Sequence, residues 1–303
     1  MIRKVALIGP STLMISLPAK WAKENRIKRG DELEVLAREG ELVVTRARAA
    51  PSTKKVQLEK KDIGAFHDNL LPFLYHKGYD EVHLIYLSDE APKVLQQKIE
   101  DLMGYEIVSE GKSSITIKNV AETNPDNFDA LLRRTFLLLM EMAESSYAAF
   151  AECQYIRLGE ISLLEKANNK YTNFLKRSIN KFGYKERENA ALAYVIVREL
   201  EEIADIFRDM CLLYFREEKS HLRKEILNLM KDTTTVLRLF YEIFYKFDAE
   251  KAESFHLQRK KMLDKGKEMV MASHGKEALL LYYILSAQQK IFDLYGPYYT
   301  MHV

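Results

Sequence analysis

The second half of the sequence, residues 126–300, has the apolar spacing of long amphipathic helices. Helices are predicted at roughly 126–154, 156–181, 186–217, 219–248, 250–273 and 276–295. Short connections join antiparallel neighbours, so we expect two three-helix bundles in tandem. The third of these helices shows the apolar stripe most clearly, at three- and four-residue steps. The stripe consists of Leu192, Val195, Ile196, Leu200, Ile203, Phe207, Met210 and Tyr214.

Residues 54–121 alternate between strand and helix patterns. Strands are predicted at 56–58, 81–87, 105–108 and 114–120, and helices at 62–76 and 91–103. The order β-α-β-α-β-β predicts a small α/β sandwich of two layers. We find no motif in this segment that indicates its role.

The first 50 residues contain only short strands and one short helix. Strands are predicted at 4–8, 13–17, 32–36 and 42–44, with a helix at 20–25. Units near ~40 residues seldom bury enough surface without a disulfide, a metal or a partner chain. This segment holds neither cysteine nor histidine. We therefore expect an obligate, intertwined homodimer, in an α+β multidomain protein with domains at 1–50, 54–121 and 125–303.

Positive charge is concentrated at the N-terminal end. The first 55 residues hold twelve Lys and Arg against six Asp and Glu, a charge of +6, so the rest carries −4 of the total +2. A compact cationic dimer is suited to a polyanion such as DNA, because binding releases condensed counterions. The alternative is that these lysines only keep a small domain soluble.

The spacing of residues 16–44 resembles the AbrB/SpoVT swapped-hairpin family. The resemblance rests on Ser16-Leu17-Pro18-Ala19-Lys20-Trp21, Ile27, Gly30-Asp31, Leu33, Val35 and Leu42-Val43-Val44. It implies an interleaved dimer that binds double-stranded DNA largely through shape and backbone. Mapped by position, the resemblance implies that the DNA contacts are Arg3, Lys4, Ser11, Thr12, Lys20 and Lys23.

The turn Gly9–Thr12 departs from this family, because many members carry an arginine where Pro10-Ser11-Thr12 stands here. Backbone N–H groups and hydroxyls also hold phosphate. For Trp21, the only tryptophan, packing of the short helix onto the dimer is favoured over stacking on DNA.

A stripe of polar residues runs along one face of the third helix of the helical region. At helical spacing, carboxylates four residues apart can chelate a cation when a facing helix completes the shell. The alternative is a stripe of ion pairs with the two arginines. The stripe consists of Arg198, Glu201, Glu202, Asp205, Arg208 and Asp209.

Residues 198–205 resemble the Leu-Glu-Arg-Ile-Gly-Asp signature of PhoU phosphate-uptake regulators. This resemblance implies metal binding, of a divalent ion or iron, through Glu-x-x-x-Asp motifs, and Glu201 and Asp205 match one motif. Elsewhere the chain departs from the family, since Glu165 is followed by Asn169. A single metal site or none is therefore expected. An N-terminal swapped hairpin with a PhoU-like body resembles the archaeal phosphate uptake regulators, which implies a phosphate-transport component as partner.

Signals for other classes of protein are weak. Two cysteines, Cys153 and Cys211, exclude a disulfide scaffold, and both are predicted to lie in the core. No catalytic motif such as H-E-x-x-H or G-x-S-x-G occurs, so no enzyme is expected. The charge-free stretch Val5–Ala19 is too short for a transmembrane helix, and the turn within it favours strand–turn–strand over a signal peptide.

These patterns predict a cytoplasmic, dimeric, DNA-binding regulator of phosphate uptake. One alternative is an adaptor that does not bind DNA and docks a phosphate transporter or a signalling kinase. Another is a metal-binding enzyme or metal store built on the acidic stripe.

Overall fold

The computed structural model divides the chain into two compact units, Met1–Ser52 and Thr53–Val303. It describes residues 2–38, 40–46, 53–59, 69–85, 91–121, 127–217 and 221–302. Small antiparallel hairpins, a mixed sheet and a helical region confirm the predicted α+β multidomain class. The finer boundary between 54–121 and 125–303 stays a prediction, because one compact unit holds both segments.

The first unit consists of two hairpins joined by a short helix. Gly9 and Gly40 adopt φ of +70° and +75° in the two hairpin turns, a region that glycine enters without steric cost. Pro18, whose φ is −59°, directly precedes the helix. The elements are β1 (Ala6–Ile8) paired with β2 (Thr12–Met14), helix α1 (Ala19–Glu24), and β3 (Leu33–Arg38) paired with β4 (Glu41–Arg46).

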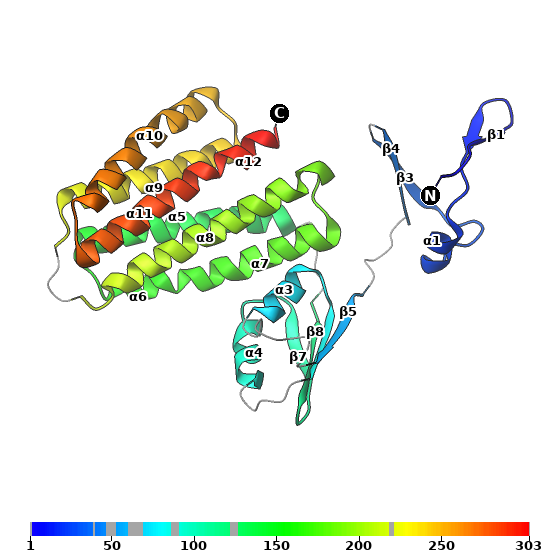
Figure 1. Ribbon diagram of the computed structural model, residues 1–303, viewed down its shortest axis with the longest axis horizontal. Helices are drawn as coiled ribbons and strands as arrows, with labels where there is room; N and C mark the ends of the chain where they lie inside the picture. The colour runs from blue at the N-terminus through cyan, green and yellow to red at the C-terminus, as the bar shows by residue number, and fades with distance from the viewer. Residues whose placement is uncertain are drawn as a thin grey trace. The chain divides into compact units, whose positions relative to one another are not determined.

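The second unit begins with a four-stranded mixed sheet of order β5-β6-β8-β7, in which only β5 and β6 are parallel. Alternate residues of the central strands, such as Val82 and Ile117, are fully buried beneath the two helices (Figure 1). The strands and helices thus follow the predicted order β-α-β-α-β-β. The beginning of the predicted helix, residues 62–68, and the end of the predicted strand, residues 86–87, lie outside the described residues. The elements are β5 (Lys55–Glu59), α3 (Leu70–His76), β6 (Glu81–Ile85), α4 (Ala91–Ile99), β7 (Tyr105–Glu110) and β8 (Ser114–Asn119).

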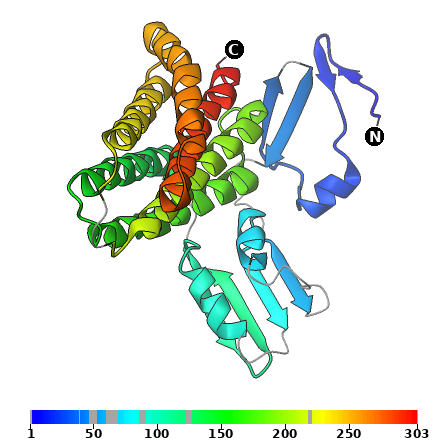
Figure 2. The same cartoon turned by 60° about the vertical axis from the view of Figure 1, so that its left-hand side comes forward.

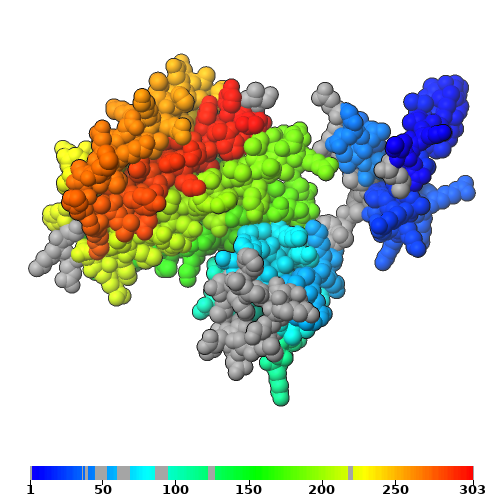
Figure 3. All heavy atoms as spheres, viewed as in Figure 1, coloured from blue at the N-terminus to red at the C-terminus, as the bar shows by residue number. Residues whose placement is uncertain are grey.

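The helical region contains two groups of three long helices. In the first group α5, α7 and α8 contact one another, and in the second α9, α10 and α11 do so. Contacts of α5 with α9 and of α8 with α11 join the groups, and α8 and α11 lie side by side in Figures 2 and 3. The elements are α5 (Phe128–Ala151), α6 (Arg157–Ser162), α7 (Leu164–Phe182), α8 (Ala190–Tyr214), α9 (Lys224–Tyr245), α10 (Ala249–Met271), α11 (Gly275–Asp293) and α12 (Tyr295–Thr300).

One continuous apolar core runs through both helix groups. The predicted stripe on α8 is buried from Ile196 onward, whereas Val195 is 42% exposed. The predicted helix at 156–181 is interrupted at Leu163, which separates α6 from α7. Cys211 is buried as predicted, but the prediction for Cys153 is wrong. Cys153 lies beyond the end of α5 with φ of +56° and is exposed.

The sheet and the helical region are joined where α3 contacts α7 (Figure 1). Arg177 of α7 is completely buried there, and its guanidinium donates to Tyr75 O at 2.9 Å, Tyr79 O at 2.7 Å and Asp80 Oδ1 at 2.6 Å. Lys181 also pairs with Asp80. Breaking such a buried pair leaves an uncompensated charge, which costs several kcal/mol, about 3–5. No helix of the described residues is long and apolar enough to cross a membrane.

Candidate nucleic-acid interface

The β1–β2 hairpin carries four of the six predicted DNA contacts, all of them exposed. Ser11 lies in the turn, and Thr12 opens β2 opposite Ile8. Arg3 and Lys4 precede β1, at the opposite end of the hairpin. Three-residue strands separate the two ends by about 10 Å, at ~3.3 Å per residue. A single chain therefore does not bring the basic pair and the hydroxyl pair together.

The remaining predicted contacts lie on α1. Lys20 and Lys23 are three residues apart, so they share one face of the helix, and both are exposed. Lys20 approaches Glu24 at 4.0 Å, but its side chain is 87% exposed and the pair is screened by solvent. Trp21 is half-buried, and its carbonyl oxygen accepts a hydrogen bond from Asn25 Nδ2 at 2.9 Å.

Three further basic residues follow α1 in the chain. Arg26, Lys28 and Arg29 are exposed in the loop that leads to β3. The loop is held by Asp31, whose Oδ2 accepts from the Lys28 backbone N–H at 2.9 Å. Its last turn uses Gly30, with φ of +93°. The charge count of the first 55 residues includes these three side chains, but the resemblance by position did not select them.

No residue of the first unit whose exposure the structure describes is buried, although many are apolar. A folded domain normally buries such side chains, and exposed apolar surface of this extent marks an interface. The large apolar side chains and their exposed fractions are Ile2 97%, Val5 61%, Leu7 64%, Ile8 50%, Leu13 71%, Met14 48%, Ile15 52%, Val35 57% and Leu42 65%.

The acidic stripe on α8 forms ion pairs in this structure. Glu201 pairs with Lys176 of α7, and Arg208 Nη1 lies 2.6 Å from Asp205 and 2.8 Å from Glu165 of α7. Burial raises the pKa of Glu165, Arg208 opposes that shift, and a hydrogen bond with Asp205 adds to it.

The two predicted metal ligands, Glu201 and Asp205, are thus each compensated by a basic side chain rather than grouped around an open position. Among the described residues no cluster of three or more His, Cys, Asp or Glu side chains is placed to hold a metal ion. Metal binding at Glu201 and Asp205 therefore stays a hypothesis, and the structure favours the ion-pair interpretation of the stripe.

Comparison with known proteins finds a family resemblance in the first unit. Residues 7–52 match the family described as antidote-toxin recognition MazE, bacterial antitoxin. The match supports an N-terminal swapped-hairpin domain of the MazE/AbrB kind, and it does not reach residues 53–303. No curated protein and no solved structure matches the chain.

Proposed function

We propose that this protein, with its MazE-like N-terminal unit, is a cytoplasmic, homodimeric regulator of transcription that binds double-stranded DNA. The observation that carries the proposal is that this unit leaves both its apolar side chains and its predicted DNA contacts exposed in a single chain. A second copy covers the apolar surface, and the cationic side chains remain outside for DNA. The proposal assigns the chain no catalytic step.

Dimerisation can also bring together the basic and hydroxyl side chains that one chain keeps apart. Because Arg3 and Lys4 lie at one end of the hairpin and Ser11 and Thr12 at the other, an interleaved partner can place one chain's basic pair beside the other's hydroxyl pair. The resulting surface contacts phosphates, which position the protein, while the shape of the duplex selects the site.

The experiment is a titration of a DNA duplex with the full-length protein over a series of salt concentrations. Lys20→Glu/Lys23→Glu reverses four charges per dimer, so we expect an affinity at least ~10-fold lower and a shallower salt dependence. Lys260→Glu/Lys261→Glu makes the same charge change at two exposed positions of α10 and serves as the matched control. We expect the control to bind like the unchanged protein.

Two outcomes would contradict the proposal. The unchanged protein fails to bind duplex DNA at low salt, or it binds with an affinity that salt does not alter. Equal weakening by the α10 control would show that overall charge, and not the surface of the first unit, determines binding.

For the helical region we propose a PhoU-like role in which it senses phosphate status or docks a phosphate-transport component. The support is the Glu201 and Asp205 match together with two groups of three helices around one core. Genome-wide mapping of bound DNA in phosphate-rich and phosphate-poor cells tests this role. We expect genes of phosphate uptake among the bound sites, and their absence would contradict it.

The adaptor function remains the second candidate, because the hairpin turn carries Pro10, Ser11 and Thr12 where an arginine was expected. In that case the first unit serves only to dimerise, and the helices dock a transporter or a signalling kinase. The Lys20→Glu/Lys23→Glu variant separates the two candidates in cells. An adaptor keeps full function after this change, whereas a DNA-binding regulator loses it.

A further inference from the structure

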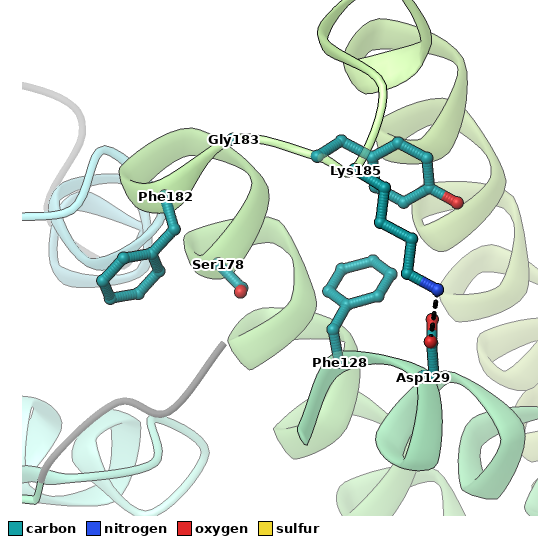
Figure 4. Close-up of a pocket in the computed structure, with 7 residues that line it drawn as sticks. Phe128, Asp129, Ser178, Phe182, Gly183 and Lys185 are labelled. Atoms are coloured by element: carbon teal, nitrogen blue, oxygen red, sulfur yellow. Dashed lines mark hydrogen bonds and ion pairs between the residues drawn. The ribbon is translucent and has the colours of Figure 1, made fainter. Parts of the chain in front are cut away.

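Two hollows lined by described residues of the second unit differ in whether their charged side chains are paired. The first, of about 440 Å³, lies where α5 begins and α7 ends (Figure 4). Asp129 and Lys185 pair with each other beside it, and the ring of Phe128 packs edge-on against Tyr184 at 5.5 Å. Because these groups already satisfy one another, this hollow indicates no particular ligand.

The second hollow, of about 410 Å³, lies beside the joint between the sheet and the helices. Ligand pockets in proteins typically enclose about 300–1,000 Å³, so its size suits a small organic molecule. Its walls come from the residues before β5, from α3 and its end, from α7 and from α8. The lining residues are Lys54, Phe73, His76, Lys77, Asn180 and Tyr194.

The charge of this second hollow is positive and uncompensated. Lys54 and Lys77 are exposed, and no ion pair of either side chain is found among the described residues. The Lys54 ammonium donates to the carbonyl oxygen of Lys77 at 3.4 Å, which is a neutral acceptor. The carboxylate of Asp80 accepts from the Lys54 backbone N–H at 3.0 Å, and its charge is already engaged by Arg177 and Lys181. No acidic side chain is among the described lining residues. Two ammonium groups in a recess without a counter-charge favour a ligand with more than one negative charge.

His76 adds no charge to the hollow at neutral pH. Burial lowers its pKa to about 4, and its Nε2 donates to Asn173 Oδ1 at 2.7 Å. Asn180 Nδ2 donates to the carbonyl oxygen of His76 at 2.9 Å, which fixes the wall between α3 and α7. The positive potential therefore comes from the two lysines, on a wall that is held in place.

Aromatic groups give the same hollow an apolar side. The Phe73 side chain is 52% exposed although it is a large apolar group. Tyr194 is half-buried, and burial raises the pKa of its phenol, which stays protonated and can donate a hydrogen bond. An exposed ring is a platform on which a planar base stacks.

We propose that this hollow binds a nucleotide, with its phosphates on Lys54 and Lys77 and its base against Phe73. Tyr194 and Asn180 supply the polar groups that orient it. A nucleotide is favoured over a DNA backbone because the basic side chains line a recess that also holds aromatic rings, rather than a ridge.

The test is isothermal titration calorimetry of the full-length protein with ADP, orthophosphate and adenosine, without DNA. We expect one ADP per chain, bound at least ~10-fold more tightly than orthophosphate or adenosine, because only ADP engages both the lysines and the ring. Lys54→Gln/Lys77→Gln should weaken ADP binding at least ~10-fold through the loss of two charge-assisted contacts. Phe73→Ala should weaken ADP binding and leave any orthophosphate binding unchanged.

The matched control is Lys260→Gln/Lys261→Gln on α10, which we expect to bind ADP normally. Thermal unfolding of each variant checks that the fold is kept, since all these side chains are exposed. Absence of ADP binding, or ADP binding that the Lys54 and Lys77 changes leave intact, would overturn the proposal. Orthophosphate binding as tight as that of ADP would overturn the nucleotide assignment. None of these results depends on whether the first unit binds DNA.

Discussion

At the scale of single residues, His76 has a strong electrostatic consequence for the joint between the sheet and the helices. Burial is the largest cause of its lowered pKa, and the nearby charges of Lys176 and Arg177 add to the shift, while the hydrogen bond with Asn173 opposes it. The neutral ring is thus built into the α3–α7 contact, where protonation places a third positive charge beside two others.

The lowered pKa of His76 predicts that the stability of the fold depends on pH. The unfolded chain binds a proton at His76 near pH 6.5 and the folded chain only near pH 4, so the free energy of unfolding decreases as the pH falls between these values. The full loss amounts to ~3 kcal/mol. We expect the His76→Gln variant, which stays neutral and keeps a donor for Asn173, to lose less stability over this range in urea unfolding. Equal losses in the two proteins would rule out His76 as the cause.

Residue spacing also identified the acidic stripe on α8, but not its partners. The i, i+3 and i, i+4 spacing places Glu201, Asp205 and Arg208 on one face. Lys176 and Glu165 come from α7, more than twenty residues earlier, and only the packing of α7 on α8 brings them to that face. The choice between metal ligands and ion pairs therefore depends on a neighbouring helix.

At the scale of elements, the close approach of α6 to the end of α8 depends on a glycine. A Cβ at Gly159 would lie 2.5 Å from the ring of Phe215, which directly follows α8. We expect Gly159→Ala to force the ring or the helix to move and to lower the free energy of unfolding by ~1–3 kcal/mol.

Gly296 in α12 provides the control, because a Cβ there meets nothing within 4 Å. Gly296→Ala is expected to be neutral or to stabilise the helix by up to ~1 kcal/mol. Chemical unfolding of both variants measures the difference. A Gly159→Ala variant as stable as Gly296→Ala would show that the α6–α8 contact adjusts without cost.

At the scale of the whole molecule, the two units bury their apolar residues in different ways. The second unit has its own cores, whereas no residue of the first unit whose exposure is described is buried in one chain. The first unit should therefore fold only as a dimer, and its stability should depend on protein concentration.

Leu13→Asp tests this dependence, because the leucine is 71% exposed in a single chain and should be covered by the partner. We expect sedimentation to show a dimer for the unchanged protein and a monomer for the variant. Leu257→Asp on α10, where the leucine is 68% exposed, is the matched control and should remain a dimer. A monomeric unchanged protein at micromolar concentration would contradict the interleaved dimer.

The order of elements and the fold class could be predicted from local patterns along the chain, because periodicity, glycine turns and segment length are local properties. The same patterns predict that the first 50 residues need a partner chain. Tertiary structure decided which helix faces are shared in one core and which charges are paired. It also placed Lys54, Lys77 and Phe73 around one hollow. These residues lie in a segment without a readable motif. Lys54 approaches Lys77 and Asp80 across the segment itself, and the packing of α3 on α7 brings Asn180 to the same hollow. Contacts of this kind depend on distances in space that residue spacing along the chain does not contain.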